Sequence, residues 1–193
     1  MNSIRESVRV IAEEHARVAA KSFEPAQLTA LEKISAVIID AFRNKKKILL
    51  CGNGGSAADS QHIAAEFIVR FKRERRSLPA IALTTDTSII TATGNDYNYE
   101  SIFSRQVEGL GEAGDVLIAI STSGNSPNVI AAVLAAKKNG MAAVGFTGAS
   151  GGKLIQHTDV HFQAASSKTP HIQEMHITAL HAVSEVVEDQ LFS

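Results

Sequence analysis

His62 and Glu66 are four positions apart in the segment SAADSQHIAAEFIVRF, a spacing that places two side chains on one face of a helix. An imidazole and a carboxylate placed in this way can bind a divalent metal. Alternatively, one of them can act as a catalytic base and the other as its hydrogen-bonding partner. An isolated pair of this kind is usually a surface contact. Here the neighbouring residues are largely alanine and bulky apolar side chains, so we expect the pair to be partly buried and to need a partner.

A second group of polar residues lies near the C-terminus, in the segment HIQEMHITALH. It contains His171, Gln173, Glu174, His176 and His181. His176 and His181 are five positions apart and therefore point in different directions from a helix. At least one of them is expected to be an ordinary packed or exposed histidine, and spacing alone leaves open which.

Two glycine- and serine-rich segments, GNGGS (52–56) and STSGNS (121–126), each follow an apolar run and precede a helical pattern. Glycine lets the backbone approach a ligand, and free N–H groups at a helix N-terminus favour an anion. Helix caps and tight turns use the same residues, so one such loop alone would be ambiguous. Two loops after two strands favour a phosphate site. Neither loop contains a lysine or a nucleotide-binding fingerprint, which favours a sugar phosphate over a nucleotide.

The elements that must position these residues can be predicted from the apolar pattern. Short apolar runs predict buried parallel strands at 47–51, 80–85, 115–121, 142–147 and, more weakly, 159–164. Helical patterns between the strands fall at 57–72, 99–110, 127–139 and 151–157. Two further helices are predicted within the first 45 residues, separated at Pro25, and a last helix over about 171–191.

The predicted fold class is α/β, with a single doubly wound five-stranded parallel sheet flanked by helices, as in flavodoxin-like proteins. We expect one domain over 1–193, consisting of an N-terminal helical pair (1–45), an α/β sandwich (46–193) and a long C-terminal helix. Nineteen Lys and Arg against 20 Asp and Glu argue against a nucleic-acid partner or a membrane surface, and we expect a cytoplasmic protein. The basic run 72–76 is expected to be a solvated helix end, and Cys51 a small buried hydrophobe.

The segments CGNGGSAADSQHIAAE, GND (94–96), STSGNS and IQEMHITALH together resemble the phosphoheptose isomerase family of bacteria, within the sugar isomerase (SIS) domain superfamily. The likeness covers essentially the whole chain. It implies the SIS fold and the conversion of sedoheptulose 7-phosphate to glycero-manno-heptose 7-phosphate, the first step towards the ADP-heptose of lipopolysaccharide. It also implies a homotetramer with active sites between subunits and, as in several members, a zinc ion.

The resemblance also implies a role for each matching residue. The implied substrate-binding residues are Asn53, Gly54, Gly55, Ser56, Glu66, Asn95, Asp96 and Gln173, with a phosphate site formed by Ser121, Thr122, Ser123 and Ser126. The implied metal ligands are His62, Glu66, Gln173 and His181. The implied catalytic pair is Glu66 and His181, which we interpret as base and acid of an enediol reaction.

Three points of tension accompany this interpretation. Gln173 and His181 are eight residues apart, about 12 Å along a helix, so either Gln173 precedes the regular helix or the two ligands come from different subunits. A carboxylate bound tightly to zinc is also a poorer base, which sets the two roles of Glu66 against each other. Finally, Pro170-His171 stands where the family commonly has Arg before IQE.

Three other functions remain open at this stage. The superfamily includes a non-catalytic scaffold that associates with the bacterial replication initiator. That protein is expected to lack counterparts of Glu66 and His181, so the presence of both here favours an enzyme. A regulatory sugar-phosphate sensor and an isomerase for another sugar phosphate are the remaining alternatives.

Overall fold

The structure is a computed structural model that describes residues 3–192, so residues 1, 2 and 193 of the expected domain lie outside the described range. Its strands are β1 (Ile48–Gly52), β2 (Ala80–Ala82), β3 (Val116–Ile120), β4 (Ala142–Thr147) and β5 (Val160–Gln163). Its helices are α1 (Ile4–Ser22), α2 (Pro25–Arg43), α3 (Gly55–Ile68), α4 (Thr87–Asp96), α5 (Ser104–Leu110), α6 (Pro127–Lys138) and α7 (Thr169–Phe192). Short 3-10 turns, η1 (Tyr99–Ser101) and η2 (Leu154–Gln156), complete the order.

The five strands form one parallel sheet in the order β2-β1-β3-β4-β5, which confirms the predicted fold class. The chain leaves β1 towards one edge of the sheet and later returns to its other side as β3. The strand order therefore reverses between β1 and β3. In open α/β sheets, ligands bind beyond the carboxyl ends of the strands at such a point.

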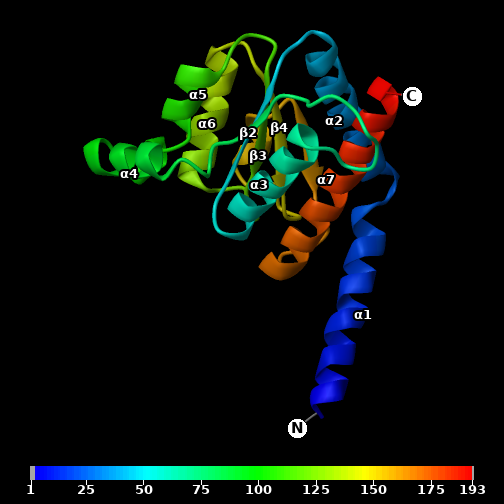
Figure 1. Ribbon diagram of the computed structural model, residues 1–193. Coiled ribbons are helices and arrows are strands. Elements are labelled where there is room, and N and C mark those ends of the chain that lie inside the picture. Colours follow the sequence, from blue (N-terminus) through cyan, green and yellow to red (C-terminus); the bar gives the residue numbers. More distant parts are fainter. Residues whose placement is uncertain (1–2, 193) are drawn as a thin grey trace.

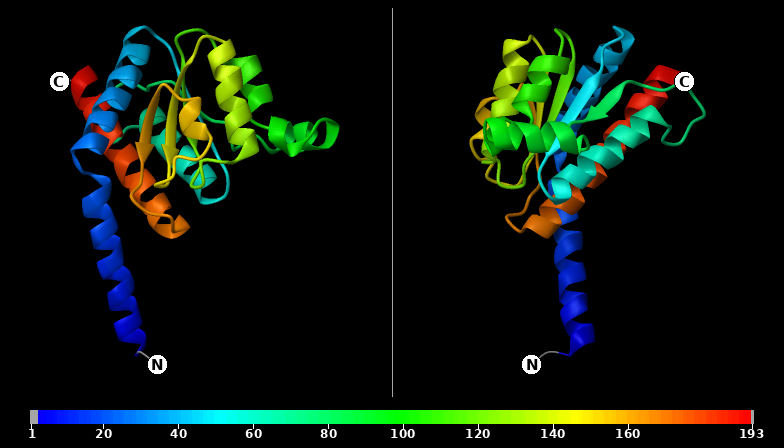
Figure 2. Two further views of the ribbon diagram at one scale, coloured as in Figure 1. Left: turned by 180° about the vertical axis from the view of Figure 1, so that it is seen from behind. Right: turned by 60° about the vertical axis from the view of Figure 1, so that its left-hand side comes forward.

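Helices cover both faces of the sheet, as Figures 1 and 2 show. Alternate residues of each strand point to opposite faces. In β1, Ile48 and Leu50 join a core with α2, α3 and α7, whereas Leu49 and Cys51 join a second core with α5 and α6. The two loops of interest thus begin from strands that are buried on both sides.

Four segments of the structure differ from the prediction. The helix predicted at 57–72 ends at Ile68, and the segment predicted at 151–157 contains only the turn η2, because Gly151 and Gly152 adopt positive φ. Helix α4 was missed, and the helix predicted at 99–110 is divided into η1 and α5. The sequence of α4, TSIITATGND, is rich in β-branched residues, and the Asp86 side chain stabilises its start by accepting a hydrogen bond from the Ile89 N–H.

The basic run 72–76 is not the solvated helix end that was predicted. It lies in the loop between α3 and β2, and the Arg75 side chain is only 1% exposed. This loop folds back onto the C-terminal part of α7 through polar contacts described below. No helix in the described part of the chain has both the length and the apolar character needed to cross a membrane.

Helix α1 extends away from the body of the molecule, with its N-terminal end far from the sheet (Figures 1 and 2). Of its residues, Ser22 is buried, while Ile4, Val8 and Ile11 are 86%, 59% and 59% exposed. An apolar stripe on an extended helix usually needs a covering surface. In this chain α1 contacts α7 through its C-terminal half, around His15.

Candidate functional site

The two glycine- and serine-rich loops lie side by side at the carboxyl edge of the sheet. Gly52 at the end of β1 is paired in register with Ile120 at the end of β3, and the loops follow directly. The first loop leads into α3 and the second into α6, so each presents a helix N-terminus at the same edge. This is the arrangement in which a phosphate group receives backbone N–H donors from two directions.

The first loop depends on two glycines for its shape. Gly54 has φ +56° and precedes the first turn of α3, a conformation that residues with a side chain rarely adopt. A Cβ atom at Gly55 would collide with the side-chain amide of Gln173 on α7. Glycine at position 55 thus allows the Gln173 amide to lie against the backbone of the loop.

The second loop is held by hydrogen bonds among its own polar side chains. The hydroxyls of Ser121 and Ser126 are 2.9 Å apart, and the Asn125 N–H donates to the Ser123 hydroxyl. Gly124 has φ +66°, and a Cβ atom there would collide with the backbone of Gly151 in the loop after β4. The loop at 121–126 therefore packs against the glycine-containing loop that follows β4.

The two loops are joined by a pair of asparagines. The side-chain amides of Asn53 and Asn128 each donate to the other's carbonyl oxygen at 2.9 Å, and the Tyr99 hydroxyl donates to Asn53 at 3.2 Å. Asn128, in the first turn of α6, is only 2% exposed. Asn128 and Tyr99 were not among the predicted site residues. An asparagine in an otherwise apolar helix was the available signal for Asn128.

The His62–Glu66 pair meets His181 of α7, and we call these three residues the α3–α7 cluster. The His62 Nε2 atom is 3.0 Å from Glu66 Oε1 and 3.3 Å from His181 Nε2. The Phe71 ring stacks on the His181 ring, with centroids 5.5 Å apart and planes inclined by 19°. Burial and the neighbouring His62 lower the pKa of His181, although Glu66 opposes this shift. The predicted i, i+4 pair is thus confirmed as a contact.

Gln173 lies apart from this cluster within the chain. It is inside α7, so the alternative in which it precedes the regular helix is wrong. Gln173 faces Gly55 and His181 faces His62, which means that α3 and α7 run side by side in the same direction (Figure 1). Asn95 and Asp96 lie exposed at the end of α4, where Asn95 donates to Asp96, and the described residues show no bond from either to the loops.

A second group of histidines and a glutamate joins α1 to α7, and we call it the α1–α7 cluster. Glu174 Oε2 is 2.6 Å from His15 Nδ1 and 3.1 Å from His171 Nδ1. His171 is 5% exposed, and its Nε2 atom is 3.7 Å from Glu14, which also pairs with Lys168. His171, which with Pro170 precedes the IQE segment, therefore forms a contact between α7 and α1.

Burial shifts the pKa of three further ionisable groups near the site, His176, Cys51 and Asp59. His176 is fully buried, its Nε2 atom lies 3.0 Å from the Thr147 carbonyl, and burial lowers its pKa to about 4. His176 is thus the packed histidine that spacing alone did not identify. Burial raises the pKa of the Cys51 thiol to about 12, which leaves it unreactive. Burial also raises the pKa of Asp59, one turn before His62, to about 6.

Comparison with known proteins places this doubly wound sheet, with two glycine- and serine-rich loops at its switch point, in the class of SIS domains. The family model described as "SIS domain" matches residues 13–148 of the chain. A phosphoheptose isomerase from Roseiflexus is 60% identical over 86% of this chain and 84% of its own length. One from Thermodesulfovibrio yellowstonii is 49% identical over 98% of this chain and 94% of its own length.

The solved structures agree with the sequence relatives. The phosphoheptose isomerase of Neisseria gonorrhoeae has a TM-score of 0.92 and 41% identity, over 97% of this chain and all of that one. The chain therefore belongs to the SIS domain family and, within it, to the phosphoheptose isomerases. It is accordingly a sugar-phosphate isomerase, as the resemblance implied.

Proposed function

We propose that the chain converts sedoheptulose 7-phosphate to D-glycero-D-manno-heptose 7-phosphate through an enediol, as the first step of ADP-heptose synthesis for lipopolysaccharide. The observation that carries this proposal is the α3–α7 cluster, which lies along the same helix whose N-terminus borders the two loops. Relatives with 47–60% identity are named phosphoheptose isomerases. The substrate's phosphate would lie in the loops and its C1 and C2 atoms near the cluster.

The chemistry requires one group that removes a proton from C1 and one that returns a proton at C2. Glu66 is suited to act as the base, since its side chain is 21% exposed and faces the cluster. His181 is suited to act as the acid or proton relay, because its ring is held by Phe71 and faces His62. Ser121, Thr122, Ser123 and Ser126 would hold the phosphate, with Asn53, Gly54, Gly55, Ser56, Asn95 and Asp96 as further substrate contacts.

The α3–α7 cluster has the donor set of a zinc site. Two imidazole nitrogens and a carboxylate oxygen lie within 4.8 Å of one another, and zinc prefers such ligands. One side-chain oxygen of the nearby Asp59 is buried without a hydrogen-bond partner among the described residues, and a second carboxylate commonly accompanies metal-bound histidine. A bound zinc ion would polarise the sugar oxygens. His62, Glu66 and His181 would hold it, with Gln173 of a neighbouring subunit as fourth ligand.

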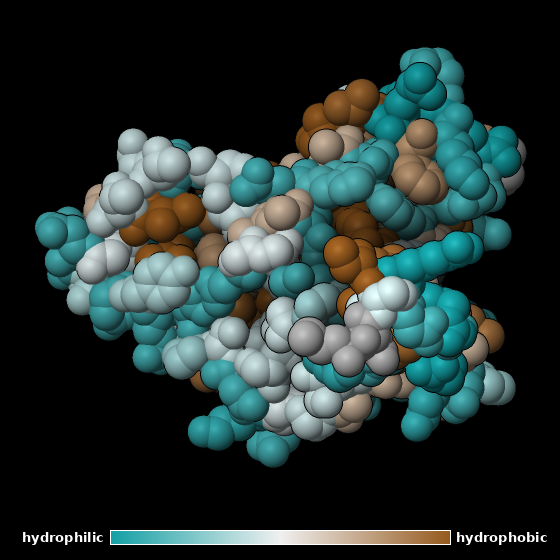
Figure 3. Space-filling model, turned by 90° about the horizontal axis from the view of Figure 1, so that it is seen from below, coloured by the Kyte–Doolittle hydropathy of each residue, from teal (hydrophilic) through white to brown (hydrophobic). Residues whose placement is uncertain are grey.

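The proposed assembly is a homotetramer with active sites between subunits, in a cytoplasmic enzyme. The exposed apolar face of α1 supports association, as does a groove of about 330 Å³ between α2 and α7. Figure 3 shows further hydrophobic surface in a hollow on the α4 side of the molecule. A groove of about 350 Å³ between α4 and α5 includes Ile89, Tyr97 and Leu110.

The test is an isomerase assay with sedoheptulose 7-phosphate on wild type, Glu66→Gln and His181→Ala. We expect either substitution to lower kcat by roughly 10²–10⁴ while the protein remains folded. Glu108→Gln and His157→Ala, which lie outside the cluster, are matched controls and should retain wild-type activity. A chelator should abolish activity and zinc should restore it. An inactive wild type with zinc present would instead favour the non-catalytic scaffold.

A further inference from the structure

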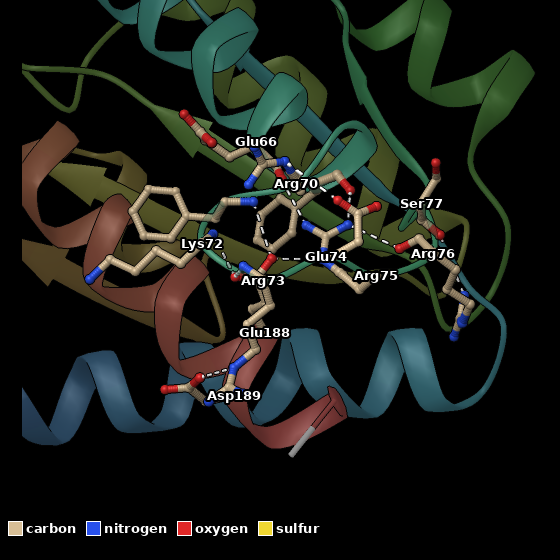
Figure 4. A network of polar contacts seen from close by, with 12 residues as sticks. Glu66, Arg70, Lys72, Arg73, Glu74, Arg75, Arg76, Ser77, Glu188 and Asp189 are labelled. Atoms are coloured by element: carbon tan, nitrogen blue, oxygen red, sulfur yellow. Dashed lines mark hydrogen bonds and ion pairs between the residues drawn. The ribbon is translucent and has the colours of Figure 1, made fainter.

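The loop between α3 and β2 is fastened to α7 by one buried ion pair (Figure 4). Arg75 and Glu188 have side chains that are 1% and 2% exposed, and Arg75 Nε donates to Glu188 Oε1 at 2.8 Å. Burying two charges in this way is costly unless every donor and acceptor is satisfied. The contacts of both side chains therefore show what the pair holds in place.

The Glu188 carboxylate organises the start of the loop. It accepts hydrogen bonds from the backbone N–H groups of Phe71, Lys72 and Arg73 at 3.1, 2.7 and 2.8 Å. Although burial alone would raise the pKa of Glu188, these N–H groups and Arg75 hold it below its ordinary value. Three successive N–H groups on one carboxylate fix the backbone of Phe71, whose ring stacks on His181.

The Arg75 guanidinium organises the end of α3. It donates to the carbonyl oxygens of Glu66 and Phe67 at 2.8 Å each. These carbonyls belong to the last turn of the helix, where backbone oxygens lack partners within the helix. Arg75 therefore caps the turn that carries the Glu66 side chain, while its other edge binds Glu188 on the helix that carries His181.

We propose that Arg75 and Glu188 are positioning residues for the isomerase reaction, which fix Glu66 and the Phe71-backed His181 relative to each other. This inference rests on the proposed function. Neither residue touches the loops at 52–56 or 121–126, so the pair acts on the geometry of proton transfer and leaves phosphate binding unchanged. A displacement of about 1 Å in catalytic groups can lower a rate by roughly a hundredfold.

The experiment compares Glu188→Gln with Asp189→Asn, its neighbour on α7. Asp189 forms an exposed ion pair with the Arg73 side chain in the same loop, at 2.6 Å, and is the matched control. We expect Glu188→Gln to lower kcat roughly ten- to hundredfold with KM for sedoheptulose 7-phosphate unchanged, and Asp189→Asn to match wild type. Equal kcat values in the two variants, or a loss confined to KM, would overturn the proposal.

A second pair of variants distinguishes a loss of catalytic positioning from a loss of folding. Phe71→Leu removes the flat ring behind His181 but leaves Arg75 and Glu188 intact, and Phe71→Tyr retains the ring. We expect Phe71→Leu to lower kcat at an unchanged melting temperature. Phe71→Tyr should have the kcat of wild type. If Glu188→Gln fails to fold, this pair decides, and equal kcat values for Leu and Tyr would refute the proposal. An inactive wild type would refute the proposed function itself.

Discussion

Helix α7 contributes to two clusters of the same composition, each with two histidines and one glutamate, and the two differ in electrostatic balance. In the α1–α7 cluster both rings face the same Glu174 oxygen, and His171 also faces Glu14. In the α3–α7 cluster the Nε2 atoms of His62 and His181 face each other at 3.3 Å, and one carboxylate oxygen lies beside them. The α1–α7 cluster thus brings two carboxylates to its two histidine rings.

The α3–α7 cluster differs because one carboxylate oxygen lies beside two rings whose Nε2 atoms face each other. Two imidazole nitrogens that face each other cannot both carry a proton without repulsion, whereas two lone pairs directed at one point bind a cation. Composition alone therefore does not distinguish a metal site from a fastening between helices. On the proposed function, the direction in which the ring nitrogens point and the number of carboxylates they meet would distinguish the two clusters.

The largest expected difference between the two clusters is in zinc binding. Wild type should bind one zinc ion per chain, His62→Ala should bind none and His15→Ala should still bind one. Metal content after dialysis and calorimetric titration would measure this. Two ions in wild type, or loss of the ion in His15→Ala, would show that the α1–α7 cluster is also a metal site.

A smaller effect is expected on stability. His15→Ala removes the contact with Glu174, whose two side chains are 43% and 46% exposed, and exposed pairs of this kind contribute about 0.2–1 kcal/mol. In a chain of this size that corresponds to a decrease in Tm of at most about 4 °C. Thermal unfolding at fixed protein concentration would measure it, with His157→Ala as control. A much larger decrease would mean that His15 supports more than the attachment of α1.

The smallest expected effect is on salt dependence. In 1 M salt the screening length falls to about 3 Å, so the Tm difference between wild type and His15→Ala should shrink towards zero. The zinc content of the α3–α7 cluster should stay the same, because direct coordination is not screened in this way. A Tm difference that persists at high salt would indicate packing as its source.

Much of the fold was predictable because its signals are local. The short apolar runs predicted all five strands, the fifth more weakly, and the i, i+4 spacing of His62 and Glu66 identified a real contact. Helix α4 was missed because its β-branched residues and glycine have low helix propensity, and a cap at Asp86 compensates.

The contacts that sequence analysis could not supply join distant parts of the chain. Arg75 is 113 residues from Glu188, and His15 is 159 residues from Glu174. Within a charged run, nothing local distinguishes Arg75 from its solvated neighbours. Burial of one arginine in such a run depends on a carboxylate that only the folded chain brings near.

The position of the α3–α7 cluster along α3 has a consequence for the length of the substrate. Gly55 at the loop end and His62 in the cluster are seven residues apart on one helix, or about 10 Å. On the proposed function, a sugar held by its phosphate at the loops would reach His62 and the rest of the α3–α7 cluster only if its open carbon chain spans that distance. The length of α3 between loop and cluster would then select substrates by the number of carbons between the phosphate and the carbonyl that reacts.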